Sequence, residues 1–181
     1  MASQSSVNKT ILANGIRILS ERVPYVDSVS VGIWAQGGSR DEDASTRGMS
    51  HFVEHMLFKG TEKRSARQIA DEMDGLGGHL NAFTDKEFTC YYSKVLREHL
   101  PTALEIISDM VLNSVFDEAE LEREKNVVLE EIKRHKDTPE DHVHDLLAET
   151  LWKGHRLGNA VIGISSVVKK ITRADAVGHV E

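Results

Sequence analysis

Two histidines and a glutamate lie close together in residues 48–58, which read GMSHFVEHMLF. In a helix, His51 and His55 stand one turn apart on the same face, the spacing at which two imidazoles can bind one zinc ion. At about 100° per residue, Glu54 lies roughly 60° to one side of His51, whereas in the commoner His-Glu-x-x-His order the glutamate lies beyond the second histidine. The inverted order is close to a mirror image of the common one. Both orders put a carboxylate beside the open position of the metal, where zinc-activated water needs a base.

The same segment has a simpler interpretation, an amphipathic helix whose histidines are solvated or bonded to the backbone. Its other residues argue against this interpretation. Phe52, Met56 and Leu57 are large and apolar, so we expect most of the helix to be buried. Buried histidines need polar partners, and a shared metal ion supplies one. The segment therefore favours a zinc site.

Composition and charge narrow the classes of function. The 181 residues are 40% hydrophobic and 28% charged, which is globular composition with enough length for one sizeable core. The formal net charge of −7 argues against nucleic acid as the main partner. No apolar run approaches the length of a membrane span, and the small polar residues 1–6 precede no hydrophobic segment. We expect a cytoplasmic protein without a membrane partner, although an organellar mature form that has lost its presequence also fits.

The single cysteine supports a reducing compartment. Cys90 cannot form an internal disulfide, and chains without disulfides suit such an environment. Its neighbours in residues 88–92 are threonine and aromatic residues. We therefore interpret Cys90 as a small buried residue rather than a nucleophile.

Local signals place strands in the first half of the chain and helices mainly in the second. Asn14-Gly15 favours a tight hairpin because both residues tolerate positive φ. Ser65 with Gln68 has the form of a capping box, and Asp117 with Glu120 is a second capping pattern. We expect strands at residues 9–12, 16–23 and 28–35, and two more within 79–95. We expect helices around His51, at 65–75, from 101, at 117–136 and 138–154, and from 172.

Strands followed by packed helices predict an α+β fold, in which a mixed, largely antiparallel sheet packs against a layer of helices. In the helix that begins near Pro101, the apolar spacing predicts one buried face formed by Leu104, Ile107, Val111 and Leu112. The last helix starts too close to Glu181 to be completed. We therefore interpret residues 1–181 as part of a longer protein.

A catalytic zinc site needs a third protein ligand and an open position for water. The helix expected from Glu118 to Lys136 offers several carboxylates. Its apolar residues cover an arc of roughly 100° that should face the core: Leu121, Val128, Leu129 and Ile132. Glu124 and Glu131, seven residues apart, lie just off that arc, whereas Glu130 points the opposite way. Glu131 and Glu124 are the candidates for an inward carboxylate; the alternative is that all these glutamates decorate a surface helix.

Together these segments resemble the pitrilysin family of inverted-motif zinc metallopeptidases. The resemblance rests on HFVEH at residues 51–55, on MLFKGT directly after it and on VVLEEI at residues 127–132. Within the family, the closer likeness is to the mitochondrial processing peptidases and their bacterial relatives, and it covers nearly the whole chain. The resemblance implies that His51, His55 and Glu131 bind one zinc ion per chain.

The resemblance also implies roles for the surrounding residues. Glu54 would be the general base, accepting a proton from zinc-activated water and passing it to the leaving amine. Glu124 would support the metal site. Asn81, Ala82 and Phe83 would lie on an edge strand along which an extended peptide substrate pairs, a mode that gives affinity through main-chain bonds with little sequence demand.

Family members continue with the rest of this domain and with a second, metal-free domain that closes over the peptide. By this resemblance, residues 1–181 are an N-terminal zinc-binding metallopeptidase domain, incomplete at its C-terminal end, whose partners include the missing half or a homologous subunit. The expected function is a zinc-dependent endopeptidase acting on extended peptides or precursor segments. The alternatives are a non-catalytic interaction subunit of the same fold and an inactive fragment. A purely structural zinc site is disfavoured because a closed site needs no base such as Glu54.

Overall fold

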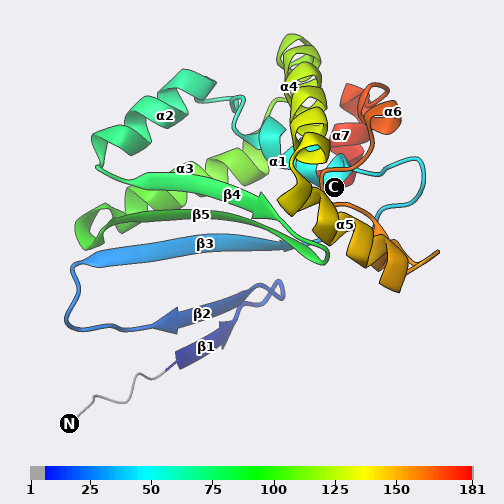
Figure 1. The fold of residues 1–181 in the computed structure, drawn as a ribbon. Coiled ribbons are helices and arrows are strands. Elements are labelled where there is room, and N and C mark those ends of the chain that lie inside the picture. The colour runs from blue at the N-terminus through cyan, green and yellow to red at the C-terminus, as the bar shows by residue number, and fades with distance from the viewer. Residues whose placement is uncertain (1–6, 181) are drawn as a thin grey trace.

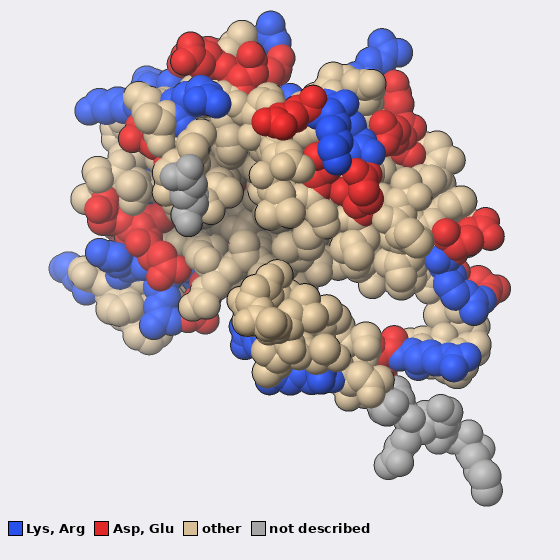
Figure 2. Space-filling model, turned by 180° about the vertical axis from the view of Figure 1, so that it is seen from behind, with Lys and Arg blue, Asp and Glu red and all other residues tan. Residues whose placement is uncertain are grey.

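The computed structural model describes residues 7–180, and the chain begins there with an antiparallel hairpin of β1 (Val7–Ile11) and β2 (Arg17–Glu21). The turn has the predicted chemistry, since Gly15 adopts a φ of 89° and the Asn14 side chain accepts a hydrogen bond from the Ile16 amide at 3.2 Å. Every residue of both strands is exposed. In the space-filling view an open gap separates part of the hairpin from the body of the molecule (Figure 2).

The main sheet has three antiparallel strands in the order β3-β5-β4. The strands are β3 (Ser28–Gln36), β4 (His79–Thr84) and β5 (Phe88–Leu96). In this register Tyr91 at the centre of β5 lies between Ile33 on β3 and Ala82 on β4, and all three side chains face the helices. Because β5 is central, β4 is an edge strand within the described residues.

Helices cover one face of this sheet (Figure 1). They are α1 (Met49–Leu57), α2 (Ala66–Gly75), α3 (Leu100–Asn113), α4 (Glu118–Asp137), α5 (Pro139–Leu151), α6 (Ser165–Val168) and α7 (Arg173–Val180), with short 3-10 turns at Arg97–His99 and Arg156–Gly158. The predicted α+β fold, an antiparallel sheet under a helical layer, is confirmed. None of the helices in residues 7–180 combines the length and apolar character that a membrane crossing requires.

The helix that carries the two histidines lies at the centre of the core. Phe52 and Met56 of α1 are fully buried, and they belong to one cluster with Tyr91 of the sheet and with Val128 and Ile132 of α4. Burying one such large apolar side chain contributes about 1.5–3 kcal/mol of transfer free energy. α1 is therefore held between the sheet and α4, which fixes the side chains on its remaining face.

The buried face of α3 differs from the predicted one. Ile107 is buried and Val111 is partly buried against the core, as expected, but Leu104 and Leu112 are 42% and 77% exposed. The residues that pack inward are Ala103, Ile106, Ile107 and Met110. α3 is apolar on more than one side, so its periodicity is compatible with two different buried faces. The face that packs against the sheet and α2 is not the one predicted from the sequence.

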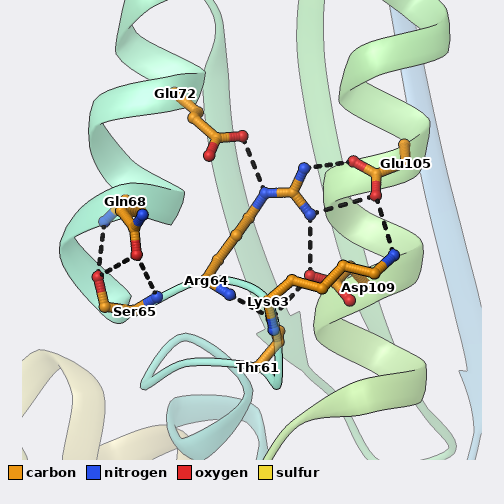
Figure 3. A network of polar contacts seen from close by, with 8 residues as sticks. All are labelled: Thr61, Lys63, Arg64, Ser65, Gln68, Glu72, Glu105 and Asp109. Carbon is orange, nitrogen blue, oxygen red and sulfur yellow. Dashed lines mark hydrogen bonds and ion pairs between the residues drawn. The ribbon is translucent and has the colours of Figure 1, made fainter.

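The segment after α1 is anchored by Arg64 (Figure 3). Its guanidinium contacts Glu72 of α2 at 2.8 Å and, on α3, Glu105 at 2.6 Å and Asp109 at 2.9 Å. Thr61 donates a further hydrogen bond to Asp109 at 2.7 Å. Burial alone would raise the pKa of Asp109, but these hydrogen bonds hold it below its usual value. The network joins the end of the histidine helix to α2 and α3.

Candidate metal centre

α1 begins at a buried carboxylate just before the two histidines. Glu42 is 2% exposed, and its two oxygens accept hydrogen bonds from the amides of Gly48 at 2.7 Å and Ser50 at 2.8 Å. These amides belong to the first turn of α1, where helix N–H groups have no partner within the helix and a negative charge is favoured. Glu42 therefore fixes the start of the helix, which begins two residues before His51.

Side chains from two distant segments converge beside α1. The Nε2 atoms of His51 and His55 lie 3.3 Å apart, and Glu131 Oε2 of α4 lies 3.9 Å from the first and 3.4 Å from the second. Donor atoms about 2.1 Å from a tetrahedral zinc ion are about 3.4 Å from one another. Glu130, one residue away, has a 71% exposed side chain and forms an ion pair with Lys133. The structure thus brings together the three residues named as ligands and leaves Glu130 in solvent.

The donor set fits a divalent metal ion. Two imidazole lone pairs that face each other at 3.3 Å repel unless a proton or a cation lies between them. Burial and the neighbouring His55 lower the pKa of His51 to about 4, which keeps its ring neutral and able to bind a metal. Two imidazoles with one carboxylate are a combination that zinc accepts.

Glu124 of α4 orients His55. Its Oε1 lies 2.8 Å from His55 Nδ1, so the ionised carboxylate accepts a hydrogen bond from this nitrogen and leaves Nε2 free for a metal. Burial opposes the charge on the His55 ring, but the bond to Glu124 and the charge of Glu131 outweigh it and raise the pKa of His55. The His51 ring has no matching support, because its buried Nδ1 has no hydrogen-bond partner within residues 7–180.

Glu54 lies on the side of α1 that faces the edge strand β4. Its Oε2 accepts a hydrogen bond from Thr84 Oγ1 at 2.5 Å. Burial raises the pKa of Glu54 despite this hydrogen bond, so the carboxylate has an increased affinity for a proton. A carboxylate of this kind beside the histidine pair has the properties of a general base.

A cleft of about 470 Å³ opens next to His51 and Glu54. Its other walls come from β4, α4, α5 and residues 161–162. The lining residues are His51, Glu54, Ala82, Phe83, Thr84, Lys86, His135, His144, Asp145, Ala148, Val161 and Ile162. Ala82 and Phe83 therefore border the cleft, while Asn81 is exposed outside it and its side chain accepts a hydrogen bond from the Ala82 amide at 2.9 Å.

Sequence reasoning missed several polar residues at this site. His135 and Asp145 pair across the cleft wall at 2.6 Å, and Thr84 holds Glu54. Nothing in the spacing of these residues indicated such contacts, because each one joins two different elements whose packing the sequence does not specify. Lys59, which contacts Glu124 at 2.6 Å, did carry a signal: it follows His55 by one further helical turn.

The fold and the converging donors define an α+β protein in which His51, His55 and Glu131 could hold one divalent metal ion. Residues 17–164 match the family described as insulinase (peptidase family M16), and the chain belongs to this family. It is 53% identical over 150 residues to the uncharacterised zinc protease YmxG of Bacillus subtilis and 45% identical over 167 residues to an uncharacterised zinc protease of Streptomyces coelicolor. These alignments cover 83% and 92% of this chain but only 37% and 36% of the relatives.

Solved structures show the same fold. A protease from Helicobacter pylori superposes with a TM-score of 0.91 at 24% identity, covering 97% of this chain and 42% of that one. The inactive domain of a peptidase M16 from Pseudomonas fluorescens superposes with a TM-score of 0.88 at 20% identity, covering 97% of this chain and 43% of that one. The fold also occurs in a domain described as inactive, so the fold alone does not show whether a protein is active. Activity depends on which residues occupy the site.

Proposed function

We propose that residues 1–181 form the N-terminal zinc-binding domain of a zinc-dependent endopeptidase that hydrolyses extended peptides or precursor segments. The observation that carries this proposal is the convergence of His51, His55 and Glu131 on one point, with ligand atoms within 4.8 Å of one another, beside a cleft that Glu54 lines. The names of the two bacterial relatives, both zinc proteases, support the same metal. One zinc ion per chain is proposed.

In the proposed site the metal ion and Glu54 have different chemical roles. Zinc held by the two imidazoles and Glu131 would supply Lewis acidity, lowering the pKa of a water molecule towards neutral and polarising a carbonyl group. Glu54 would accept a proton from the water whose oxygen forms the new C–O bond at the carbonyl carbon, and would donate that proton to the amine that leaves as the C–N bond breaks. Because Thr84 occupies one oxygen of Glu54, the other oxygen is available for these transfers.

We propose that the substrate binds as an added strand along β4. This strand is at the edge of the sheet within the described residues, and Ala82 and Phe83 border the cleft. An extended peptide beside Asn81, Ala82 and Phe83 gains main-chain hydrogen bonds with little demand on its sequence, and its chain then passes the metal centre. The missing half proposed from the family, or a homologous subunit, would close over it.

A zinc measurement combined with a peptidase assay tests the proposal. Residues 1–181 and the native polypeptide that contains them are analysed for zinc and assayed with an unstructured fluorogenic peptide, with and without a chelator. We expect one zinc per chain in both and hydrolysis that the chelator abolishes and added zinc restores. If the native polypeptide hydrolyses the peptide and residues 1–181 do not, then residues 1–181 need the proposed second half for activity. A metal-free native polypeptide would instead support the interaction-subunit alternative.

Glu54→Gln separates catalysis from metal binding in the native polypeptide. The amide keeps the size of the side chain but cannot accept the proton, so zinc content stays at one per chain while hydrolysis falls by about 100-fold or more. Glu130→Gln is the matched control, because the Glu130 side chain lies in solvent on α4, the helix that carries Glu131. This substitution should leave zinc content and the rate of hydrolysis unchanged. Hydrolysis by Glu54→Gln at the wild-type rate would refute the role proposed for Glu54.

A further inference from the structure

A lysine extends the polar contacts of the metal centre beyond Glu124. Lys59 follows the last turn of α1, and its amide still donates to the Met56 carbonyl at 3.0 Å. Its Nζ lies 2.6 Å from Glu124 Oε2, while the other oxygen of Glu124 lies 2.8 Å from His55 Nδ1. The carboxylate of Glu124 is thus held between an ammonium group and an imidazole.

The spacing of the two helices explains this contact. His51, His55 and Lys59 follow one another at intervals of four residues, and they meet Glu131 and Glu124, which are seven residues apart on α4. Glu131 reaches the two histidines, and Glu124 reaches His55 and Lys59. The packing of α1 against α4 therefore brings the proposed ligands together and also places Lys59 beside Glu124.

Burial makes the ammonium group necessary. The Glu124 side chain is 5% exposed, and a carboxylate shielded from water stays charged only when its oxygens are paired and hydrogen-bonded. His55 satisfies one oxygen and Lys59 the other. The Lys59 side chain is 28% exposed, so it spans from solvent to the buried carboxylate.

We propose that Lys59 is a positioning residue for the metal centre. By pairing with Glu124 it keeps that carboxylate pointed at His55 Nδ1, which holds the His55 ring with Nε2 directed at the metal position. This inference rests on the zinc site of the proposed function, but it concerns metal binding and not hydrolysis. It can therefore be tested on residues 1–181 whether or not they hydrolyse peptides.

Zinc affinity, measured by competition with a chromophoric chelator, tests the role of Lys59. Partners of ligating histidines contribute about 10–100-fold to metal affinity. We expect Lys59→Met to weaken zinc binding by about tenfold, at the lower end of that range because Lys59 acts through Glu124. Lys59→Arg keeps the charge and should bind zinc within about threefold of the wild type. Lys63→Met is the matched control: this lysine is 63% exposed and pairs with Glu105 away from the metal centre, and its loss should leave affinity unchanged.

A double-mutant cycle distinguishes positioning from a general effect on the fold. In Glu124→Gln the buried charge is gone, so adding Lys59→Met should not weaken zinc binding further. Thermal unfolding of each metal-free variant shows whether it folds, and Lys59→Gln replaces Lys59→Met if the latter does not.

Three results would overturn the inference. Wild-type zinc affinity in a folded Lys59→Met variant would show that Lys59 does not support the site. Equal losses with and without Glu124→Gln would show that Lys59 acts separately from Glu124. A wild-type chain that binds no zinc would defeat the proposed function and this inference together, whereas the first two results leave the proposed function intact.

Discussion

Thr84 donates a hydrogen bond from its Oγ1 to Glu54 Oε2 at 2.5 Å, which joins the edge strand β4 to the histidine helix α1. The same hydroxyl lies 3.3 Å from Thr89 Oγ1 on the neighbouring strand β5. The proposed base is therefore fixed by the strand along which the substrate is proposed to bind. Any shift of β4 would move the oxygen that Glu54 presents to the cleft.

Thr84→Val removes this hydrogen bond with almost no change in shape. Without it Glu54 can rotate, so we expect kcat for peptide hydrolysis by the native polypeptide to fall by about tenfold with little change in KM, because positioning of the base matters most in the transition state. Thr84→Ser keeps a hydroxyl and should retain most of the activity. Zinc content should stay at the wild-type level in both. A Thr84→Val enzyme with unchanged kcat would show that Glu54 does not depend on Thr84.

Glu131→Gln tests the third proposed ligand directly. An amide oxygen carries no charge and binds zinc far more weakly than a carboxylate, so we expect the zinc affinity of residues 1–181 to fall by more than about 100-fold. Glu130→Gln, one residue away but 71% exposed, should leave affinity unchanged. Equal affinities in the two variants would remove Glu131 from the proposed ligand set.

Much of the fold was predictable because local chemistry determined it. Asn14-Gly15 predicted the first hairpin, and the capping box of Ser65 with Gln68 is present at the start of α2. Asp117 likewise accepts hydrogen bonds from two amides in the first turn of α4. Each of these signals lies within a few residues of the structure it specifies, so no tertiary information was needed.

The site was predictable only where helical geometry carried the information. The wheel of α4 separated Glu131, beside the histidines, from Glu130 in solvent. The contact between Glu54 and Thr84 could not be found in this way, because it depends on how close β4 lies to α1. Leu104 and Leu112 were wrongly assigned to the buried face of α3 for a similar reason: α3 has apolar residues on two faces, and only packing against the sheet decided between them.

Asp109 should make the stability of the fold depend on pH. Its pKa is held below its ordinary value of about 3.9, so its stabilising contribution is complete above that pH and is lost as the pH falls through the lowered folded-state pKa. Asp109→Asn leaves Arg64 and Thr61 less well paired, and we expect a loss of about 1–3 kcal/mol in the free energy of unfolding at pH 7.

Denaturant titrations at pH 7 and at pH 3 check this expectation. The difference between wild type and Asp109→Asn should be smaller at pH 3, because the wild type then loses part of the charged contact as well. Asp71→Asn, whose exposed carboxylate pairs with Arg67 on the surface of α2, should change stability by less than about 0.5 kcal/mol. A difference for Asp109→Asn that grows in acid would contradict the assigned direction of the pKa shift.

Gly163 should be required for the position of α1. Its backbone has a φ of 77°, and a Cβ atom there would lie 2.3 Å from the Cα of Gly48, the residue that precedes α1. Gly163→Ala must therefore push apart the two chain segments at the start of the histidine helix. We expect a fall in Tm of several degrees and weaker zinc binding, since His51 lies three residues after Gly48.

Gly154→Ala separates steric displacement from backbone strain. Gly154 has a closely similar φ of 75°, but a Cβ atom there would meet no other atom within 4 Å. An alanine at either position pays the same left-handed backbone penalty of about 1–2 kcal/mol. Only Gly163→Ala adds a clash with the start of α1, so it should lower Tm further than Gly154→Ala and should alone weaken zinc binding. Equal effects of the two substitutions on Tm and on zinc affinity would mean that the contact between Gly163 and Gly48 does not hold the metal centre in place.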